Sequence, residues 1–360
     1  MKNSSLIFLL SLLFIGCSSS DESLNTSPGQ EEPLYFPPLQ GSIWETRSIV
    51  SLDWNEDAVA PLLTYLEQKN SKGFIIVVDG KIVMENYFNG HSATTNWYWA
   101  SAGKTLTATM TGIAEQENLL NINDKVSDYL NPGWTSLPSE KEDLITNKHL
   151  LTMTSGIDDV ANEDCVTADC LIYKADAGTR WAYHNVYVKL QDVIAQASGQ
   201  TYNSYFNSKL RDRIGMNGSW VNLGNNSVYA STTRSMARFG LLMLNKGKWS
   251  NETILNESYF NEATTTSQDL NKAYGYLWWL NGKSSYHLPQ TQFEFQGPLI
   301  PSAPGDMFMA LGKNDQKIYI IPGKKMVVVR MGEVANPENP TFALSGFDNE
   351  LWQKINALYE

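Results

Sequence analysis

The segment WASAGKTLTATMTGIA, residues 99–114, contains two overlapping motifs that predict different proteins. Its tripeptide GKT, residues 103–105, looks like the end of a phosphate-binding loop, whereas Ser101 stands three residues before Lys104. The phosphate-binding motif needs a second glycine five positions before its last one. That position holds Tyr98, so the phosphate-binding interpretation fails and the serine–lysine pair remains.

The serine–lysine spacing places both side chains on one face of a helix, because residues three apart are neighbours there. A helix that begins near Ser101 would direct the N–H of Ser101 out of its positive end, where it suits an oxyanion. A buried lysine near polar groups can lose its proton near neutral pH, so Lys104 could activate the serine hydroxyl. No other lysine of the chain follows a serine at this spacing. The structural alternative is that Ser101 only caps the helix.

A second candidate group lies in AGTRWAYHN, residues 177–185, a glycine-containing irregular stretch before a helical pattern. Polar side chains of such a loop can converge on a cleft. The phenol of Tyr183 could pass a proton to a leaving group, and Asn185 offers an orienting amide. His184 alternates with these residues and is expected to point away in a structural role. Tyr183 could also be a packed core residue, and the same Tyr-x-Asn triplet begins at Tyr87, Tyr205 and Tyr259.

The composition is that of an ordinary globular chain of 360 residues, with 42% hydrophobic and 18% charged positions. Its net charge of -11, without a lysine or arginine run, argues against nucleic acid or an anionic membrane surface as a partner. The histidines are scattered and show no His-Glu-x-x-His pattern; they are His91, His149, His184 and His287. We expect neither a metal nor another cofactor.

The N-terminus resembles a bacterial lipoprotein signal, because an apolar run over residues 6–15 follows a basic residue and precedes Cys17. The run is too short to span a bilayer. The resemblance implies a signal peptide over residues 1–16 and a lipid on Cys17, which would be the only membrane contact. It also implies a location in the cell envelope, on the periplasmic side of the outer membrane or at the cell surface. Phe14 stands where that motif usually has leucine, and a plain secretory signal is the alternative.

Residues 17–40 are rich in serine, glutamate and proline with almost nothing to bury, so they predict a flexible tether before a folded domain over residues 41–360. Within that domain only Cys165 and Cys170 remain. An exported chain enters a compartment where thiols oxidise, so we predict a short-loop disulfide between them.

The order of elements predicts an α+β fold. A helical pattern over residues 57–69 is followed by two β-rich runs over residues 73–88 that meet at Asp79-Gly80, a hairpin signal. Mostly helical patterns then fill an inserted lobe, about residues 105–270. Later β-type runs cover residues 274–280, 307–312, 317–323 and 325–332. A closing helix is expected over residues 345–358. Strands at both chain ends predict one antiparallel sheet flanked by the N- and C-terminal helices, with the helical lobe inserted between its strands.

Several segments occur in the chain order of a known superfamily: SAGK (101–104), KHLLTMTSGI (148–157), AGTRWAYHN (177–185), STTRSMARFGLLMLNKGKW (231–249) and FMALGKNDQKIYIIP (308–322). Over residues 45–358 the chain resembles the serine β-lactamase and D-Ala-D-Ala peptidase superfamily, and most of all its class C-like branch, which includes esterases. The resemblance implies the β-lactamase/transpeptidase fold. It also implies that Ser101 is the nucleophile and Lys104 its activating partner, with Tyr183 as general acid and base and Asn185 as the orienting amide.

The third motif of that superfamily departs from its pattern here. The family has Lys or His, a small residue and Gly on a strand, and the matching triplet is Ala310-Leu311-Gly312. In the lactam- and peptide-cleaving members of the family, this cation helps to bind a substrate carboxylate. Its absence here favours ester or amide substrates that have no such carboxylate. The amide N–H just after Gly312, that of Lys313, could still be the second oxyanion donor. Lys313 is the alternative cation for the site, but on an extended strand a shift of three positions reverses the face to which a side chain points, so its side chain is expected on the other face.

These features predict a metal-independent serine hydrolase that forms an acyl-enzyme on a small ester or amide substrate. The alternatives within the superfamily are a D-Ala-D-Ala carboxypeptidase and a β-lactamase. A non-catalytic, penicillin-binding-like surface binder is the alternative from another class. The missing cation favours the binder, and the retention of Ser101, Lys104, Tyr183 and Asn185 argues against it.

Overall fold

The computed structural model describes residues 33–160, 165–223, 226–338 and 346–360. The predicted signal peptide, the predicted lipid attachment at Cys17 and most of the predicted tether lie outside these ranges. Leu34–Glu360 fold as one unit. No helix among the described residues combines the length and the apolar character that crossing a bilayer requires.

The folded unit begins at Leu34, before Gly41, where the predicted domain starts. The Tyr35 N–H donates to the carbonyl oxygen of Asp79 at 3.0 Å. The ring of Phe36 meets the ring of Trp249 edge to face at 5.1 Å. Because these aromatic residues find partners in the fold, the boundary between tether and domain lies earlier than predicted.

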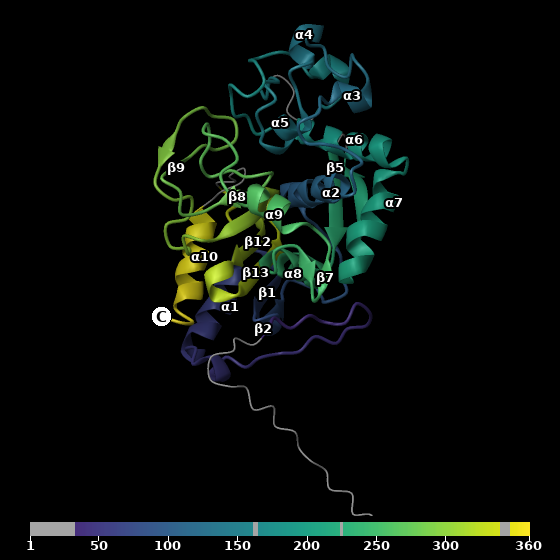
Figure 1. Ribbon diagram of the computed structural model, residues 1–360. Coiled ribbons are helices and arrows are strands. Elements are labelled where there is room, and N and C mark those ends of the chain that lie inside the picture. The colour runs from purple at the N-terminus through teal and green to yellow at the C-terminus, as the bar shows by residue number, and fades with distance from the viewer. Residues whose placement is uncertain (1–32, 161–164, 224–225, 339–345) are drawn as a thin grey trace, which may run out of the picture. The chain divides into compact units, whose positions relative to one another are not determined.

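A six-stranded sheet forms the centre of the unit, in the strand order β2-β1-β13-β12-β11-β8 (Figure 1). The strands are β1 (Ser71–Val78), β2 (Lys81–Tyr87), β8 (Trp279–Leu280), β11 (Phe308–Gly312), β12 (Gln316–Ile321) and β13 (Met326–Gly332). All neighbours are antiparallel. β1 pairs with β13, with Ile75 opposite Val329, so the N-terminal hairpin and the C-terminal strands share one sheet. The predicted antiparallel sheet is confirmed.

The β1–β2 hairpin turns at Asp79-Gly80, as the sequence predicts. Both residues have positive φ, 50° and 84°, which is the combination that a two-residue type I′ turn requires. Aspartate tolerates this conformation, and glycine adopts it without a Cβ penalty. Local sequence therefore sets the register of the first two strands.

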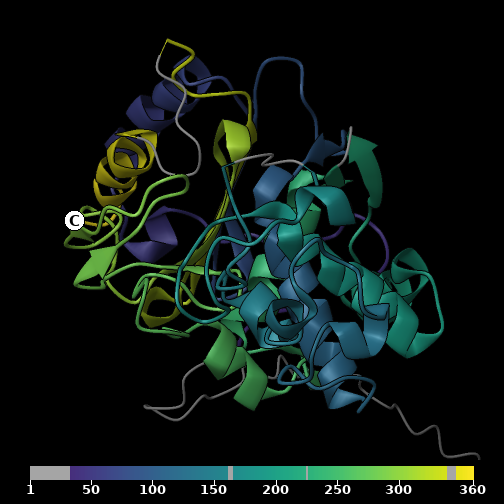
Figure 2. The same cartoon turned by 90° about the horizontal axis from the view of Figure 1, so that it is seen from above.

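The two terminal helices cover one face of the sheet. α1 (Val59–Gln68) and α10 (Gly346–Asn356) lie side by side there, and in Figure 2 they are the adjacent purple and yellow helices. The rings of Tyr65 and Phe347 stack between them at 5.8 Å. The predicted pairing of the first and last helices on the sheet is confirmed.

α8 (Thr233–Leu244) covers the opposite face of the sheet. Two neighbouring residues of β12 show both layers: Ile318 lies against Gly240 of α8, while the Tyr319 ring meets the Trp352 ring of α10 at 5.5 Å. Successive side chains of a strand point to opposite faces. α8 therefore belongs to the α/β sandwich, although its residues lie inside the predicted lobe range.

The segment between β2 and β8 forms a mostly helical lobe, as predicted. Its α-helices, apart from α8, are α2 (Lys104–Gln116), α3 (Ser127–Leu130), α4 (Ser139–Glu142), α5 (Asn147–Leu151), α6 (Lys189–Ser198), α7 (Tyr202–Phe206) and α9 (Glu257–Ala263). α2 is buried from Lys104 to Ala114, so it is a core helix without a solvent-facing polar side along that stretch. A π-helical turn, Asn207–Arg211, follows α7.

The same segment contains strands that the helical patterns do not predict. A three-stranded sheet has the order β3-β5-β4, formed by β3 (Trp97–Tyr98), β4 (Ser219–Leu223) and β5 (Asn226–Ser231). A two-stranded ribbon pairs β6 (Lys248–Trp249) with β7 (Glu252–Thr253), and beyond the segment, after β8, a second ribbon pairs β9 (Ser285–Tyr286) with β10 (Phe295–Gln296). β3 lies just before Ser101, so the small sheet ties the start of α2 to a hairpin far along the chain.

The strand predicted over residues 274–280 is wrong except for β8. Leu277 has a φ of 60°, and a residue in this left-handed conformation interrupts an extended strand. The aromatic side chains of the run pack in different directions instead: the Tyr274 ring is edge-on to the Tyr183 ring at 6.3 Å, whereas the Trp278 ring stacks on the Phe239 ring of α8 at 5.9 Å. Tertiary packing of aromatic rings therefore outweighs the β propensity of this segment.

A buried ion pair links the sheet to α10. The Lys317 side chain of β12 is fully buried, and its Nζ lies 2.9 Å from one carboxylate oxygen of Asp348 and 3.3 Å from Asp315. The Tyr319 hydroxyl donates to the other Asp348 oxygen at 2.5 Å. Asp348 therefore compensates a charge that water does not reach.

We expect Asp348→Ala to lower the free energy of unfolding by about 3 to 5 kcal/mol, because it leaves the Lys317 charge poorly compensated in the core. Urea denaturation followed by circular dichroism measures the loss. Glu257→Ala, which removes the partner of Lys246 at the surface, is the matched control and should cost about 1 kcal/mol or less. Equal losses in the two variants would contradict the importance of the buried pair.

Candidate active site

Ser101 lies in a tight turn at the start of α2. The turn is the 3-10 helix η3 (Ala100–Gly103), and α2 follows it directly. Ala100 has a φ of 48°, a left-handed conformation that costs energy for a residue with a Cβ. The Trp99 N–H donates to the carbonyl oxygen of Tyr229 at 2.8 Å. Packing around the turn therefore fixes a strained backbone that presents Ser101 at the head of a buried helix.

The Lys104 amine lies at the centre of the site. Its Nζ donates to Oγ of Ser101 at 2.9 Å and to Oδ1 of Asn185 at 3.5 Å. The rings of Tyr183 and Tyr187 flank it, with centroids 4.8 and 4.4 Å from Nζ. Lys104 is 3% exposed, so these contacts replace water around the amine. The structure thus brings together the serine, lysine, tyrosine and asparagine that the sequence singles out.

Tyr183 and Asn185 come from the segment that leads into the 3-10 helix η5 (Asn185–Val188). The Tyr183 ring stacks on the Trp279 ring of β8 at 5.7 Å, so the edge of the sheet supports it. Tyr183 is buried by this packing and also lines the cavity that contains Ser101. It is therefore a packed residue and a site residue at once.

His184, which lies between Tyr183 and Asn185 in the sequence, caps the 3-10 helix η5. Its Nδ1 accepts the Val186 N–H at 3.0 Å, at the start of η5. Burial lowers the pKa of His184 to about 4, so the ring is neutral at physiological pH and Nδ1 remains an acceptor. The cap holds the backbone of Asn185, which agrees with the structural role expected from the sequence, although His184 is also among the residues that line the cavity.

The end of β11 approaches the Ser101 turn closely at Gly312. A Cβ added there would stand 2.5 Å from the carbonyl oxygen of Trp99 and 3.0 Å from the backbone nitrogen of Ala102. Only glycine, which has no side chain, allows the two backbones to come so near. The peptide that follows Gly312 is therefore carried to the Ser101 turn.

Lys313 lies differently from the prediction. β11 ends at Gly312, and the turn η8 (Lys313–Asp315) follows with Asn314 at a φ of 59°. The alternation of strand faces does not continue through such a turn, and Lys313 lines the same cavity as Ser101. Ala310 is buried in the strand and provides no charge. The third motif is therefore followed by a cation on the turn instead of carrying one on the strand.

These groups line a cavity of about 350 Å³. Its lining consists of Tyr98, Ala100, Ser101, Lys104, Tyr183, His184, Asn185, Tyr187, Leu223, Ser227, Val228, Lys313 and Asn314. Sequence patterns did not predict Tyr98, Tyr187 and Asn314, which adjoin predicted site segments. The Asn314 side-chain amide donates to the Tyr98 hydroxyl at 2.7 Å. The β4–β5 hairpin was not predicted either, because no sequence motif marks it. Among the described lining residues there are two lysines and no aspartate or glutamate.

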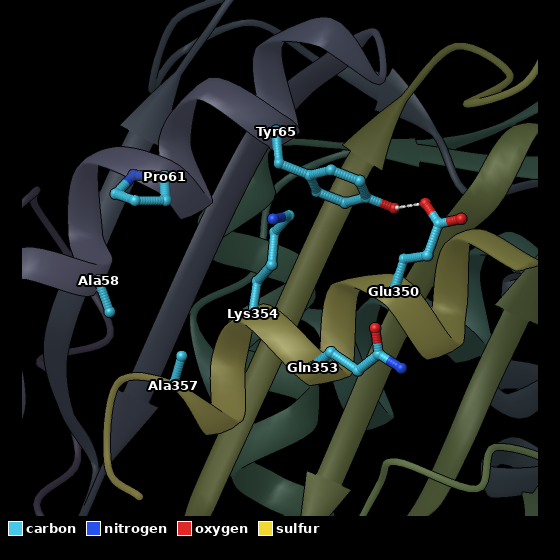
Figure 3. Close-up of a pocket in the computed structure, with 7 residues that line it drawn as sticks. All are labelled: Ala58, Pro61, Tyr65, Glu350, Gln353, Lys354 and Ala357. Atoms are coloured by element: carbon cyan, nitrogen blue, oxygen red, sulfur yellow. Dashed lines mark hydrogen bonds between the residues drawn. The ribbon is translucent and has the colours of Figure 1, made fainter.

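A second cavity, of about 510 Å³, lies between α1 and α10 (Figure 3). It is lined by Ala58, Pro61, Tyr65, Glu350, Gln353, Lys354 and Ala357. The Tyr65 hydroxyl donates to Oε2 of Glu350 at 2.9 Å, and burial raises the pKa of Tyr65. This lining has no serine or cysteine, so the Ser101 cavity is the better candidate for covalent chemistry.

Cys165 and Cys170 are joined by a disulfide. With Asp169 they form the one group of potential metal ligands gathered in the part of the chain that the structure describes. Because the disulfide uses both sulfur atoms, this group offers a metal ion little more than one exposed carboxylate.

An α/β sandwich with an inserted helical lobe and a cavity-lining serine is the architecture of a class of serine hydrolases. The family described as Beta-lactamase matches residues 65–341, so the chain belongs to the β-lactamase family. The resemblance seen in the sequence segments is thereby confirmed. No curated protein gives a significant match to the chain.

Solved structures share the fold at low sequence identity. A putative β-lactamase from Bacteroides dorei DSM 17855 is 16% identical with a TM-score of 0.66, over 85% of this chain and 99% of that one. A putative 6-aminohexanoate-dimer hydrolase from Bacillus anthracis is 19% identical with a TM-score of 0.67, over 90% and 89%. A class C β-lactamase is 19% identical with a TM-score of 0.62, over 85% and 96%. At these identities the likeness shows the fold alone.

We expect Gly312→Ala to push the end of β11 away from the Ser101 turn, because the new Cβ would collide with the Trp99 carbonyl. The rate constant for labelling of Ser101 by a fluorophosphonate should fall about tenfold or more, as when an oxyanion donor is displaced. Gly346→Ala, where an added Cβ meets nothing within 4 Å, should be labelled at the wild-type rate. Equal rates in both variants would show that the close approach is unimportant for the site.

We expect His184 to make the fold sensitive to acid. The imidazole titrates near pH 6.5 in the unfolded chain and, because burial disfavours its charged form, at about 4 in the folded chain. Between these pH values the unfolded state binds more protons, so stability falls as the pH drops, by about 3 kcal/mol from this group at pH 4.

Urea denaturation at pH 7.5 and at pH 4 measures this contribution. His184→Asn is the matched variant, because its amide oxygen can accept the Val186 N–H without titrating. The variant should lose less stability than the wild type between the two pH values. An identical loss in both proteins would show that His184 does not contribute to the acid sensitivity.

Proposed function

We propose that the protein is a Ser-x-x-Lys hydrolase that cleaves a small ester or amide through an acyl-enzyme on Ser101. The observation that carries the proposal is the 2.9 Å hydrogen bond from Lys104 Nζ to Ser101 Oγ within a cavity of about 350 Å³. Tyr183 and Asn185 line the same cavity from another segment. In this proposal Lys104 activates Ser101, Tyr183 acts as general acid and base, and Asn185 orients the amine and the substrate.

The proposed reaction has two halves. Oγ of Ser101 attacks the substrate carbonyl carbon while its proton passes to the amine of Lys104, which acts in its unprotonated form. The carbonyl oxygen becomes an oxyanion, which the N–H groups of Ser101 and Lys313 stabilise. The intermediate collapses and expels the leaving group, which takes a proton from the Tyr183 phenol, and Lys104 returns the serine proton to Tyr183. Water then attacks the acyl-enzyme and gives one proton to Lys104. The second intermediate releases the acid, and Oγ of Ser101 takes that proton back.

The apolar part of the cavity wall and the missing strand cation favour a neutral acyl group. Ala310 occupies the strand position at which the family's third motif has a cation, and it is buried. The walls combine the aromatic rings of Tyr98 and Tyr187 with the apolar side chains of Leu223 and Val228, a lining typical of small-molecule sites. The structural neighbour from Bacillus anthracis, a putative 6-aminohexanoate-dimer hydrolase, supports substrates other than β-lactams for this fold.

A D-Ala-D-Ala carboxypeptidase or a β-lactamase is the second candidate. Lys313 favours it, because a lysine on the cavity wall can bind a substrate carboxylate. A non-catalytic binder has less support. Burying the Lys104 amine beside Ser101 costs desolvation free energy, and binding alone gives no reason to retain that pair.

Labelling and turnover experiments test the proposal. Wild-type protein should form a fluorophosphonate adduct and hydrolyse p-nitrophenyl butyrate, with benzylpenicillin turned over at least about 100-fold more slowly. Ser101→Ala should lose the adduct and about 1,000-fold or more of the hydrolysis rate. Ser92→Ala, which changes an exposed serine, is the control and should behave like the wild type.

Rapid turnover of benzylpenicillin would favour the second candidate over the esterase or small-amide hydrolase. Intact-mass analysis that finds no adduct on Ser101 with either reagent would favour the binder and reject the proposed function.

A further inference from the structure

A buried arginine that does not line the cavity donates hydrogen bonds to the backbone of the turn η8. Arg330 of β13 is fully buried and is not among the cavity-lining residues. Its Nη1 donates to the carbonyl oxygens of Asn314 at 2.9 Å and Asp315 at 3.0 Å, both within η8. The guanidinium therefore binds the backbone of the turn from the protein core, outside the cavity lining.

The five N–H donors of Arg330 match five hydrogen bonds. Besides the two carbonyls of η8, they reach the carbonyl oxygens of Lys69 at 2.7 Å and Glu333 at 2.9 Å, and the Ser71 hydroxyl at 3.1 Å. Burial lowers the pKa of Arg330 to about 10, which still leaves the group charged at neutral pH. A planar fork with fixed donor directions suits this set of carbonyls, and the compact ammonium of lysine does not reproduce it.

The turn needs such support because its backbone is strained. Asn314 and Asp315 both have a φ of 59°, and consecutive left-handed residues persist only where the surroundings hold them. Gln316 also stabilises the turn. Its buried side-chain amide donates to the carbonyl oxygens of Asn314 at 2.8 Å and Gly332 at 2.6 Å. Arg330 and Gln316 thus bind the same carbonyl of Asn314 from the core.

We propose that Arg330 is a positioning residue for oxyanion stabilisation, which fixes η8 so that the Lys313 N–H points at the substrate carbonyl oxygen. The inference rests on the proposed function, because it concerns the second oxyanion donor of the Ser101 site. The connection is short: Gly312 lies against the Ser101 turn, Lys313 follows it, and two of the four carbonyls that Arg330 binds belong to the next two residues. A change at Arg330 therefore reaches the donor through a single turn of backbone.

Arg238 of α8 is a matched control for Arg330. It is also buried, at 6% exposure, and burial lowers its pKa to about 10 as well. Its guanidinium likewise binds backbone carbonyls, those of Ile214 at 2.9 Å and Pro38 at 2.7 Å. Neither carbonyl belongs to a residue that lines the Ser101 cavity, so Arg238→Lys disturbs a similar cluster away from the site.

Steady-state hydrolysis of p-nitrophenyl butyrate by the full chain tests the inference. Arg330→Lys should lower kcat about 10- to 100-fold with KM within about threefold of wild type, because an oxyanion donor acts in the transition state. Arg238→Lys should lower the melting temperature by a similar amount but leave kcat within about threefold. Gln316→Met, which removes the other donor to the Asn314 carbonyl, should lower kcat in the same way as Arg330→Lys.

A kcat of Arg330→Lys no lower than that of Arg238→Lys, or a change confined to KM, overturns this inference and leaves Ser101-dependent hydrolysis intact. If Arg330→Lys does not fold, the same comparison between Gln316→Met and Arg238→Lys decides. If the wild-type protein shows no Ser101-dependent hydrolysis, the proposed function itself is rejected, and the role of Arg330 is rejected with it. Failure of the Arg330 inference and failure of the proposed function therefore give different results.

Discussion

Burial of the Lys104 amine is the constraint on which the rest of the site depends. A buried amine needs partners that replace water, and this one has the Ser101 hydroxyl, the Asn185 amide and the faces of Tyr183 and Tyr187. The groups that solvate the amine are therefore the same groups that chemistry at Ser101 would use. Displacing any of them changes both the stability of the core and the environment of the serine.

The site forms where three segments that are distant in the sequence meet: the η3 turn, the segment before η5 and the end of β11. Each is held by a rigid neighbour. α2 is buried behind η3, the Trp279 ring supports Tyr183, and Arg330 binds the carbonyls of the turn after β11. Side chains and backbone amides can hold a reactive geometry only when such supports fix them, so the sandwich and the lobe are both needed to build the cavity.

Short-range patterns predicted much of the fold. The hairpin at Asp79-Gly80 follows from the φ preferences of two residues, and the strands of the C-terminal half and the closing helix follow from periodicity. The errors arose where distant partners decide the backbone: the β3-β5-β4 sheet, the aromatic run over residues 274–280, and residues 34–40 of the predicted tether. In each case contacts across the fold outweighed local propensity, and the local sequence does not contain those contacts.

By itself, the sequence determined which groups are chemically able to act. Ser101 and Lys104 are one helical turn apart, so their meeting requires only the local backbone. The tertiary structure alone decided that Tyr183 and Asn185 join them, that a strand end reaches the serine through Gly312, and that Lys313 lines the cavity. These outcomes depend on closing long loops and packing a whole sheet against a lobe, and the free energy that selects them is spread over the entire fold.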